Sequence, residues 1–191
     1  MKQRWTDRET PSGLLNLSVN DITYDSSRNV KRRILKACNE CAYSGYNEDK
    51  EFATLLDAQA GKPLKGYHLL MGTQNEVDIS SWSDIINNAI PLSLIVIHNH
   101  TIMAPFSLDD INTFLSHPSL KSAVVTVGEH AYYLEKKEDS VCDYDRFIQK
   151  AVKCFPGESH FKNKEKWDNN KVSAFLASIF SEFGIIYRRW S

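Results

Sequence analysis

The fold is decided by the stretch Leu92-Ser93-Leu94-Ile95-Val96-Ile97-His98-Asn99-His100. Its first six residues are almost continuously apolar and rich in β-branched side chains. A run of this kind is typical of a strand buried on both faces, as in sheets that helices cover on each side. The stretch therefore predicts an α/β fold with a mixed central β-sheet flanked by helices.

Turn residues and hydrophobic periodicity place further elements around this strand. Ser81, with Asp84 three residues later, is expected to cap a helix that ends before Pro91. Helices are expected over residues 28–43, 81–90, 107–115, 143–155 and 171–183. Strands are expected over residues 51–57, 67–71, 77–79, 92–97, 123–127 and 131–134, with a last edge strand at 185–187.

The length of 191 residues suits a single domain with appended segments. Residues 1–45 are expected to form an N-terminal arm, polar and irregular over its first twenty residues, and a helix packed on the core. Residues 46–139 form the expected core. Residues 140–191 are expected to add a C-terminal helical extension, with a mobile polar loop over residues 156–170.

Composition excludes several classes of protein. With 42% hydrophobic and 25% charged residues, the chain is neither disordered nor fibrous. Its apolar runs are far shorter than the roughly 20 residues that span a bilayer, and residues 1–11 are polar, so neither a membrane span nor a signal peptide is expected. Four cysteines in this length do not form a disulfide scaffold. We expect a cytoplasmic location, or delivery into a target cell as part of a larger effector.

The net charge of −1 conceals an uneven distribution. Residues 37–145 carry six basic and sixteen acidic side chains, a net charge of −10. Because this segment is a poor match for a nucleic-acid backbone, nucleic acid is not expected as a partner. The segment suits a divalent cation or a basic peptide, although solvated surface charges alone would give the same pattern.

Two histidines follow the central strand at a spacing that suits a metal site. Residues two apart on a strand project to the same face, so His98 and His100 are expected to lie side by side. A six-residue loop then leads to Ser107, where a helix is expected to begin, and Asp110 lies one turn into that helix. Two His and one Asp, with one position left for water, are typical of a catalytic zinc site.

Each half of this pattern also has a simpler explanation. Two histidines at a strand end can be polar residues at the mouth of a core. Ser107 and Asp110 can act solely as a helix N-cap pair. Only the conjunction of the two halves at short range favours zinc binding.

The whole stretch resembles the JAMM (also called MPN+) metalloprotease motif, which is an upstream Glu, His-x-His, a spacer and Ser-x-x-Asp. Eukaryotic and archaeal deubiquitinases share this motif, as do bacterial RadC-like proteins. The Phe106-Ser107 pair and the short spacer most resemble JAMM domains of bacterial polymorphic toxins and phage-associated proteins. The common spacer has seven residues, and bacterial members often have Pro at the position of Thr101. The resemblance implies a JAMM or cytidine-deaminase-like fold over residues 48–135.

The resemblance also implies a role for each residue of the motif. His98, His100 and Asp110 would bind Zn²⁺, and Ser107 would stabilise the tetrahedral oxyanion and position Asp110. The upstream Glu would be the general base, which takes a proton from the attacking water and delivers it to the leaving amine.

Three glutamates could be this base. Glu51 is preferred because residues 51–57, followed by Gly61-Lys62, match the strand-turn-strand order of the family. Glu48 and Glu76 remain alternatives.

These expectations give one main functional hypothesis and two alternatives. The main hypothesis is a zinc-dependent metallopeptidase or isopeptidase of JAMM type that acts on proteins or peptides, ubiquitin-like conjugates among them, as a bacterial effector or toxin domain. One alternative is a catalytically inactive JAMM-fold binding module, which the short spacer and Thr101 motivate. The other is a RadC-like nucleic-acid-associated protein, which the acidic middle disfavours. No oligomeric state is predicted.

Two other groups of residues are assigned structural roles. Cys38 and Cys41 form a lone CxxC pair on an expected helix, with no second pair at zinc-finger spacing, so they are expected to pack in the core. His117, before Pro118, is expected to be a helix cap or a surface residue.

Overall fold

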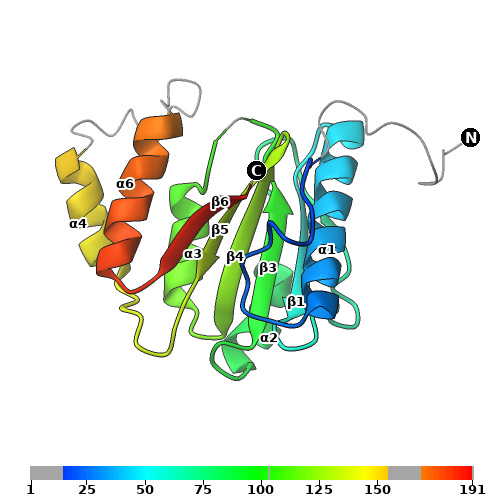
Figure 1. Ribbon diagram of the computed structural model, residues 1–191, viewed down its shortest axis with the longest axis horizontal. Coiled ribbons are helices and arrows are strands. Elements are labelled where there is room, and N and C mark those ends of the chain that lie inside the picture. Colours follow the sequence, from blue (N-terminus) through cyan, green and yellow to red (C-terminus); the bar gives the residue numbers. More distant parts are fainter. Residues whose placement is uncertain (1–14, 103, 155–168, 191) are drawn as a thin grey trace, which may run out of the picture.

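The centre of the molecule is a sheet of six strands, namely β1 (Phe52–Asp57), β2 (Leu70–Met71), β3 (Leu94–Asn99), β4 (Leu120–Val127), β5 (His130–Glu135) and β6 (Ile186–Trp190). The computed structural model describes residues 15–102, 104–154 and 169–190. The strand order is β2-β1-β3-β4-β5-β6. Figure 1 labels β1 and β3 to β6, which lie side by side in this order. Only β3 and β4 are parallel, and every other neighbouring pair is antiparallel. The predicted α/β class with a mixed central sheet is therefore confirmed.

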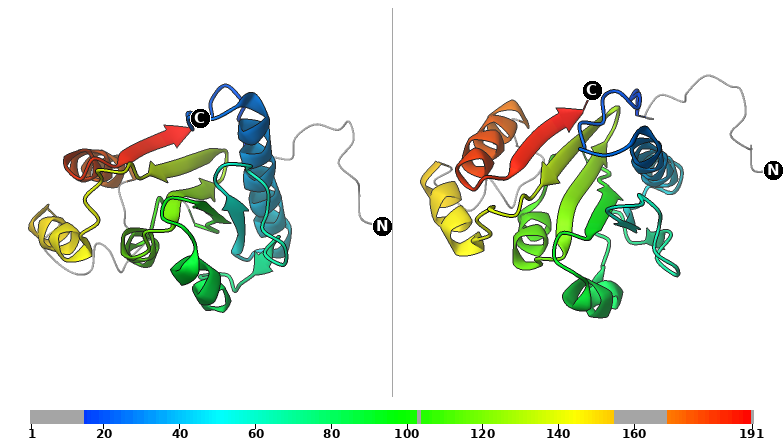
Figure 2. Two further views of the ribbon diagram at one scale, coloured as in Figure 1. Left: turned by 90° about the horizontal axis from the view of Figure 1, so that it is seen from below. Right: turned by 60° about the horizontal axis from the view of Figure 1, so that its bottom comes forward.

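Helices cover both faces of this sheet. They are α1 (Arg28–Glu48), the short 3₁₀ helix η1 (Ser80–Trp82), α2 (Ser83–Asn88), α3 (Leu108–Ser116), α4 (Tyr144–Cys154) and α6 (Asn169–Glu182). Helix α1 packs across one face, and α3, α4 and α6 lie on the other (Figures 1 and 2). Within the described ranges, no helix is both long enough and apolar enough to cross a membrane.

Strand β3 separates two hydrophobic clusters because its side chains alternate between the faces of the sheet. All of its residues are buried. Ile95 and Ile97 pack in the cluster under α1, whereas Leu94 and Val96 pack on the side of α3. A strand that is buried on both faces explains the continuous apolar run in the sequence.

The limits of β3 differ by two residues from the prediction. Leu92 adopts a left-handed backbone with φ of 58°, which is incompatible with a strand, so β3 begins at Leu94. At the other end the strand continues through His98 and Asn99. The first histidine therefore lies within the sheet.

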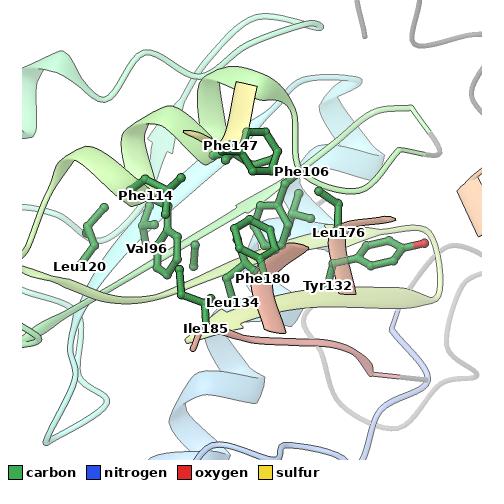
Figure 3. Packing of buried hydrophobic residues seen from close by; sticks show 14 of the residues in the cluster. Val96, Phe106, Phe114, Leu120, Tyr132, Leu134, Phe147, Leu176, Phe180 and Ile185 are labelled. Carbon is green, nitrogen blue, oxygen red and sulfur yellow. The ribbon is translucent and has the colours of Figure 1, made fainter. Parts of the chain in front are cut away.

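The hydrophobic cluster on the α3 side of the sheet is the larger of the two, and it packs α3 against the sheet (Figure 3). Phe147 of α4 stacks on Phe180 of α6 with ring centroids 5.7 Å apart, and Phe114 of α3 is fully buried in the same cluster. Burial of each such side chain contributes roughly 1.5–3 kcal/mol. The apolar face of α6, which includes Leu176, packs in the same cluster.

Both ends of the described chain pack against the sheet. Ile22 and Tyr24, which follow the polar stretch of the first twenty residues, are buried in the α1-side cluster. Trp190 of β6 donates its indole N–H to Thr23 Oγ1 at 3.1 Å. The predicted edge strand is confirmed and extends to Trp190. Residues 1–14 of the expected arm, the last residue of the helix expected over residues 143–155, and residues 156–168 of the expected loop lie outside the described residues.

Two predictions near residue 80 are wrong. Residues 77–79 form a loop rather than a strand, because the Asp78 carboxylate accepts a hydrogen bond from Ser80 N–H and begins η1. Ser81 lies inside η1, so it does not cap α2, whose N-cap residue Trp82 makes no side-chain cap. The strand expected over residues 67–71 is reduced to the two residues of β2.

The two cysteines of the CxxC pair and His117 have the structural roles that the sequence predicts. Cys38 and Cys41 are fully buried on the core face of α1. His117 is the C-cap of α3. Both predictions are confirmed.

Candidate metal centre

The site lies where β3 ends and α3 begins, on the α3 side of the sheet. The backbone N–H of His100 donates to Thr126 O of β4 at 3.0 Å, so the chain keeps its sheet conformation beyond the end of β3. His98 and His100 therefore point to the same face, as predicted, with their Nε2 atoms 3.1 Å apart. Both are more than 90% buried.

Asp110 completes a three-residue cluster with these histidines. Its Oδ1 lies 3.1 Å from His98 Nε2, and its Oδ2 lies 3.2 Å from His100 Nε2. The three side chains form a group that could hold a metal ion. The sequence prediction that these residues come together is confirmed.

A capping box at the start of α3 places Asp110. Ser107 is the N-cap, and its Oγ accepts from Asp110 N–H at 3.1 Å. Asp110 Oδ2 in turn accepts from both the backbone N–H and the hydroxyl of Ser107, each at 2.7 Å. Ser107 and Asp110 thus cap the helix, and the same contacts orient the carboxylate toward the imidazoles. A role in helix capping is therefore compatible with a role in metal binding.

The hydrogen bonding of His100 fixes which nitrogen faces the site. Its Nδ1 lies 3.0 Å from Ala104 O in the loop before α3. Because a carbonyl oxygen can only accept, Nδ1 carries the proton, and the Nε2 of a neutral ring presents its lone pair to the cluster. Metal-binding histidines are commonly oriented by a partner of this kind.

The geometry of the cluster fits a tetrahedral metal ion. Bonds of 2.0–2.2 Å from zinc to nitrogen and oxygen separate neighbouring ligand atoms of a tetrahedral site by roughly 3.3–3.6 Å. The two Nε2 atoms lie 3.1 Å apart, and each has a different Asp110 oxygen nearby, Oδ1 at 3.1 Å from His98 and Oδ2 at 3.2 Å from His100. The three side chains therefore converge at distances slightly shorter than those around a bound ion. Nitrogen and carboxylate donors of this kind suit zinc and related divalent metals.

The electrostatic surroundings of Asp110 suit a cation ligand. Burial alone would raise the pKa of its carboxyl, but the charge of His98 and hydrogen bonds from His100 and His98 hold the pKa well below its usual value in the metal-free protein. These contacts require protons on the Nε2 atoms, and a bound cation would take the place of those protons beside the Asp110 carboxylate.

A cleft of about 470 Å³ opens beside the cluster. Its floor consists of small side chains on three neighbouring strands, Ala53, Val96 and Ala123. One wall is the loop of residues 75–79, and the opposite wall is the first turn of α3. His98, His100, Ser107 and Asp110 all contribute to the lining.

Glu51 lines the same cleft from the start of β1. Ala53 is the cross-strand partner of His98, and Glu51 lies two residues before Ala53, so the three side chains share a face of the sheet. Glu51 is only 4% exposed. Of the two alternative bases, Glu76 lines the cleft but is exposed, and Glu48 is exposed at the end of α1 and does not line it.

The rim of the cleft is acidic. Glu76, Asp78 and Asp109 line it in addition to Glu51 and Asp110, and the described lining residues include no Lys or Arg. Hydrogen bonds from the backbone and side chain of Ser80 lower the pKa of Asp78. The cleft therefore has a negative field that suits a positively charged ligand.

Asn99 has a part in the site that the sequence pattern did not predict. This buried residue lies between the two histidines, and its side chain hydrogen-bonds the backbone on both sides of Glu51. One signal was present in the sequence, because a polar residue on the second buried face of a strand must find buried partners. Which partners it finds depends on the register of β1 and cannot be obtained from spacing.

Comparison with known proteins does not add to this description. No protein-family model, curated protein or solved structure matches the chain. The geometry of the site therefore carries the functional proposal.

Proposed function

We propose that this protein is a zinc-dependent hydrolase of JAMM type that cleaves a peptide or isopeptide bond. The observation that carries the proposal is the cluster of His98, His100 and Asp110 at metal-ligand separations, with Glu51 in the same cleft. Three protein ligands leave one position of a tetrahedral ion for water or substrate, which is typical of catalytic zinc.

The order of elements around the site supports a JAMM-like fold. Glu51 immediately precedes β1, which is the antiparallel neighbour of β3, the strand that carries His98. The spacer of six residues still brings Asp110 within 3.2 Å of both imidazoles, so it is compatible with a three-ligand site.

The chemistry of such a site divides between the metal and the chain. Bound zinc would polarise the scissile carbonyl and lower the pKa of a water molecule to about 7. The Glu51 carboxylate would accept the proton of the attacking water and later protonate the leaving amine. Its position in the cleft, on the same face as His98, suits both transfers.

Ser107 is the proposed donor to the oxyanion. Its hydroxyl lines the cleft and is engaged with Asp110 Oδ2. Because a hydroxyl rotates about its Cβ–Oγ bond, it can turn to donate to a negatively charged oxygen in the cleft. A donor placed where charge develops stabilises the transition state.

The proposed substrate is a protein or peptide with a basic segment near the scissile bond, and ubiquitin-like conjugates belong to this class. The acidic rim of Glu76, Asp78 and Asp109 supports this choice. The same negative field disfavours a nucleic-acid substrate.

Metal analysis combined with a cleavage assay tests the proposal. The purified full chain should hold one equivalent of zinc, His100→Ala should lose it while remaining folded, and the control variant His68→Ala, at an exposed histidine outside the cluster, should keep it. The zinc-loaded protein should cleave members of a panel of peptides and ubiquitin-like fusions, and a chelator should abolish the cleavage.

The outcomes separate the proposal from its alternatives. A protein that holds no zinc would contradict the enzyme hypothesis. Stoichiometric zinc without cleavage of any substrate would favour a catalytically inactive binding module. The short spacer and Thr101 are the departures from the JAMM motif that suggest this alternative.

A further inference from the structure

We infer that Asn99, the residue between the two histidines, is a positioning residue that clamps the backbone of Glu51 at the cleft. The inference rests on the proposed function in one respect, since it takes Glu51 to be the base. Its structural part, the clamp itself, depends only on the contacts of Asn99.

The clamp follows from the alternation of side chains along β3. His98 and His100 point to the cleft, so Asn99 points to the opposite face, towards α1. There Asn99 Oδ1 accepts from Phe52 N–H at 2.7 Å, and Asn99 Nδ2 donates to Lys50 O at 3.1 Å. These two backbone groups are the immediate neighbours of Glu51 on either side.

Only an amide side chain satisfies both contacts. Phe52 offers a backbone donor and Lys50 offers a backbone acceptor, so the side chain between them must accept with one atom and donate with the other. A carboxylate of the same shape could accept from Phe52 but would repel the Lys50 carbonyl. Asn99 is 4% exposed, so water cannot replace a lost partner without cost.

Helix α1 holds the amide in place from behind. A Cβ atom added to Gly45 would lie 2.1 Å from Asn99 Nδ2, so a larger residue at this helix position would push the amide out of place. Asn99 thus lies between α1 and the start of β1, where its two hydrogen bonds hold the amide.

The backbone of Glu51 itself is held from the other side. Glu51 N–H donates to Thr73 O at 2.7 Å, and Gly72 N–H donates to Glu51 O at 2.8 Å. With Asn99 on the neighbouring residues, the backbone groups of residues 50–52 are bonded on both sides. Strand β3 and the residue that follows it would therefore supply the two histidine ligands from one face, and Asn99 would fix the position of the base from the other.

The experiment is a double-mutant cycle on the full, zinc-loaded chain. Asn99→Asp and Asn99→Ala are each combined with Glu51→Gln. Ser119→Ala is the control, because it also deletes a buried hydrogen bond, from Ser119 to Ile86 O, outside the cleft lining. Zinc content, kcat and KM are measured for each variant.

We expect both Asn99 variants to keep stoichiometric zinc and to lose at least about ten-fold in kcat, since small misplacements of a catalytic group are costly. In the Glu51→Gln background the same substitutions should change the residual rate less than about two-fold, because the group that they displace no longer acts. Ser119→Ala should leave kcat nearly unchanged. An equal loss in both backgrounds, or loss of zinc in Asn99→Ala, overturns the inference.

If the wild-type chain cleaves no substrate, the proposed function fails and the clamp is judged by amide hydrogen exchange. Asn99→Ala should then raise the exchange rate of the Phe52 amide at least about ten-fold, whereas Ser119→Ala should not. Unchanged exchange at Phe52 overturns the clamp.

Discussion

Glu51 and Glu76 both line the cleft, but their surroundings differ. Glu51 is 4% exposed and its backbone is bonded on both sides, whereas Glu76 is exposed on the wall loop. A general base needs a fixed position relative to the attacking water. These differences favour Glu51 for that role.

Substitution of the two glutamates distinguishes them. Glu51→Gln should retain zinc but lower kcat by about 10²–10⁴-fold, the usual contribution of a general base. Glu76→Gln should change kcat less than about three-fold and serves as the matched control. Full activity in Glu51→Gln, or a large loss only in Glu76→Gln, would assign the base differently.

At the residue scale, spacing alone was enough to find His98, His100 and Asp110. The period of a strand and the first turn of a helix determine their directions, and both are local properties of the chain. Asn99 could not be found in this way, because its partners at Lys50 and Phe52 are almost fifty residues away in the sequence.

At the scale of single elements, the start of α3 links helix stability to metal binding. Ser107→Ala removes the N-cap and a hydrogen bond to Asp110 Oδ2. The free energy of unfolding of the metal-free protein should fall by about 1 kcal/mol, and zinc affinity should fall by about ten-fold because the ligand loses an orienting partner.

Denaturant titration and a competitive zinc assay measure these two effects. Ser107→Thr is the control, since threonine keeps a capping hydroxyl and should retain most of both. Equal stability and zinc affinity in Ser107→Ala and the wild type would show that the capping box does not position Asp110.

Lys136 stabilises the other end of α3 at a cost that depends on pH. Its ammonium donates to the carbonyls of Phe114 and His117 at the helix C-terminus, and burial lowers its pKa from 10.5 to about 8. Because the unfolded chain holds this proton more tightly, it binds more protons than the folded chain between pH 8 and 10.5. The lysine therefore makes the free energy of unfolding rise with pH across that window, and its contribution is constant below it.

Comparison with Lys136→Met isolates this contribution. Between pH 7 and pH 10, the unfolding free energy of the wild type should rise by about 2 kcal/mol relative to the variant. Urea titrations at intervals across this range measure the difference. Parallel pH dependence in the two proteins would show that burial does not shift this lysine.

Helices and strands were predicted correctly where several neighbouring residues favour the same structure. The prediction failed where a single side-chain contact determines the path of the backbone. The apolar run of β3 and the Ser-x-x-Asp signal of α3 each specify one structure. Val77 and Ile79 are equally apolar, but the bond from Ser80 N–H to the Asp78 carboxylate turns the chain into η1 instead.

At the scale of the whole molecule, the sheet brings together segments from the two ends of the described chain. Strand β6 was expected from its apolar residues, but its pairing with β5 and the contact of Trp190 with Thr23 depend on tertiary packing. Sequence patterns therefore gave the α/β class without the strand order.

The charge of the cleft predicts a dependence on ionic strength. For a peptide with Lys next to the scissile bond, kcat/KM should fall by several-fold as salt rises from 0.05 to 0.5 M, because screening weakens attraction to the acidic rim. For the same peptide with norleucine in place of Lys, the change should be small. Equal salt dependence of the two peptides would show that the rim carboxylates do not select the substrate.

The central claim is that His98, His100 and Asp110 together bind zinc. Anomalous diffraction recorded on both sides of the zinc absorption edge, from crystals of the zinc-loaded chain, tests it most directly. We expect one strong peak within about 2.0–2.2 Å of His98 Nε2, His100 Nε2 and an Asp110 carboxylate oxygen. A zinc peak at another place, with these three side chains unoccupied, would contradict it.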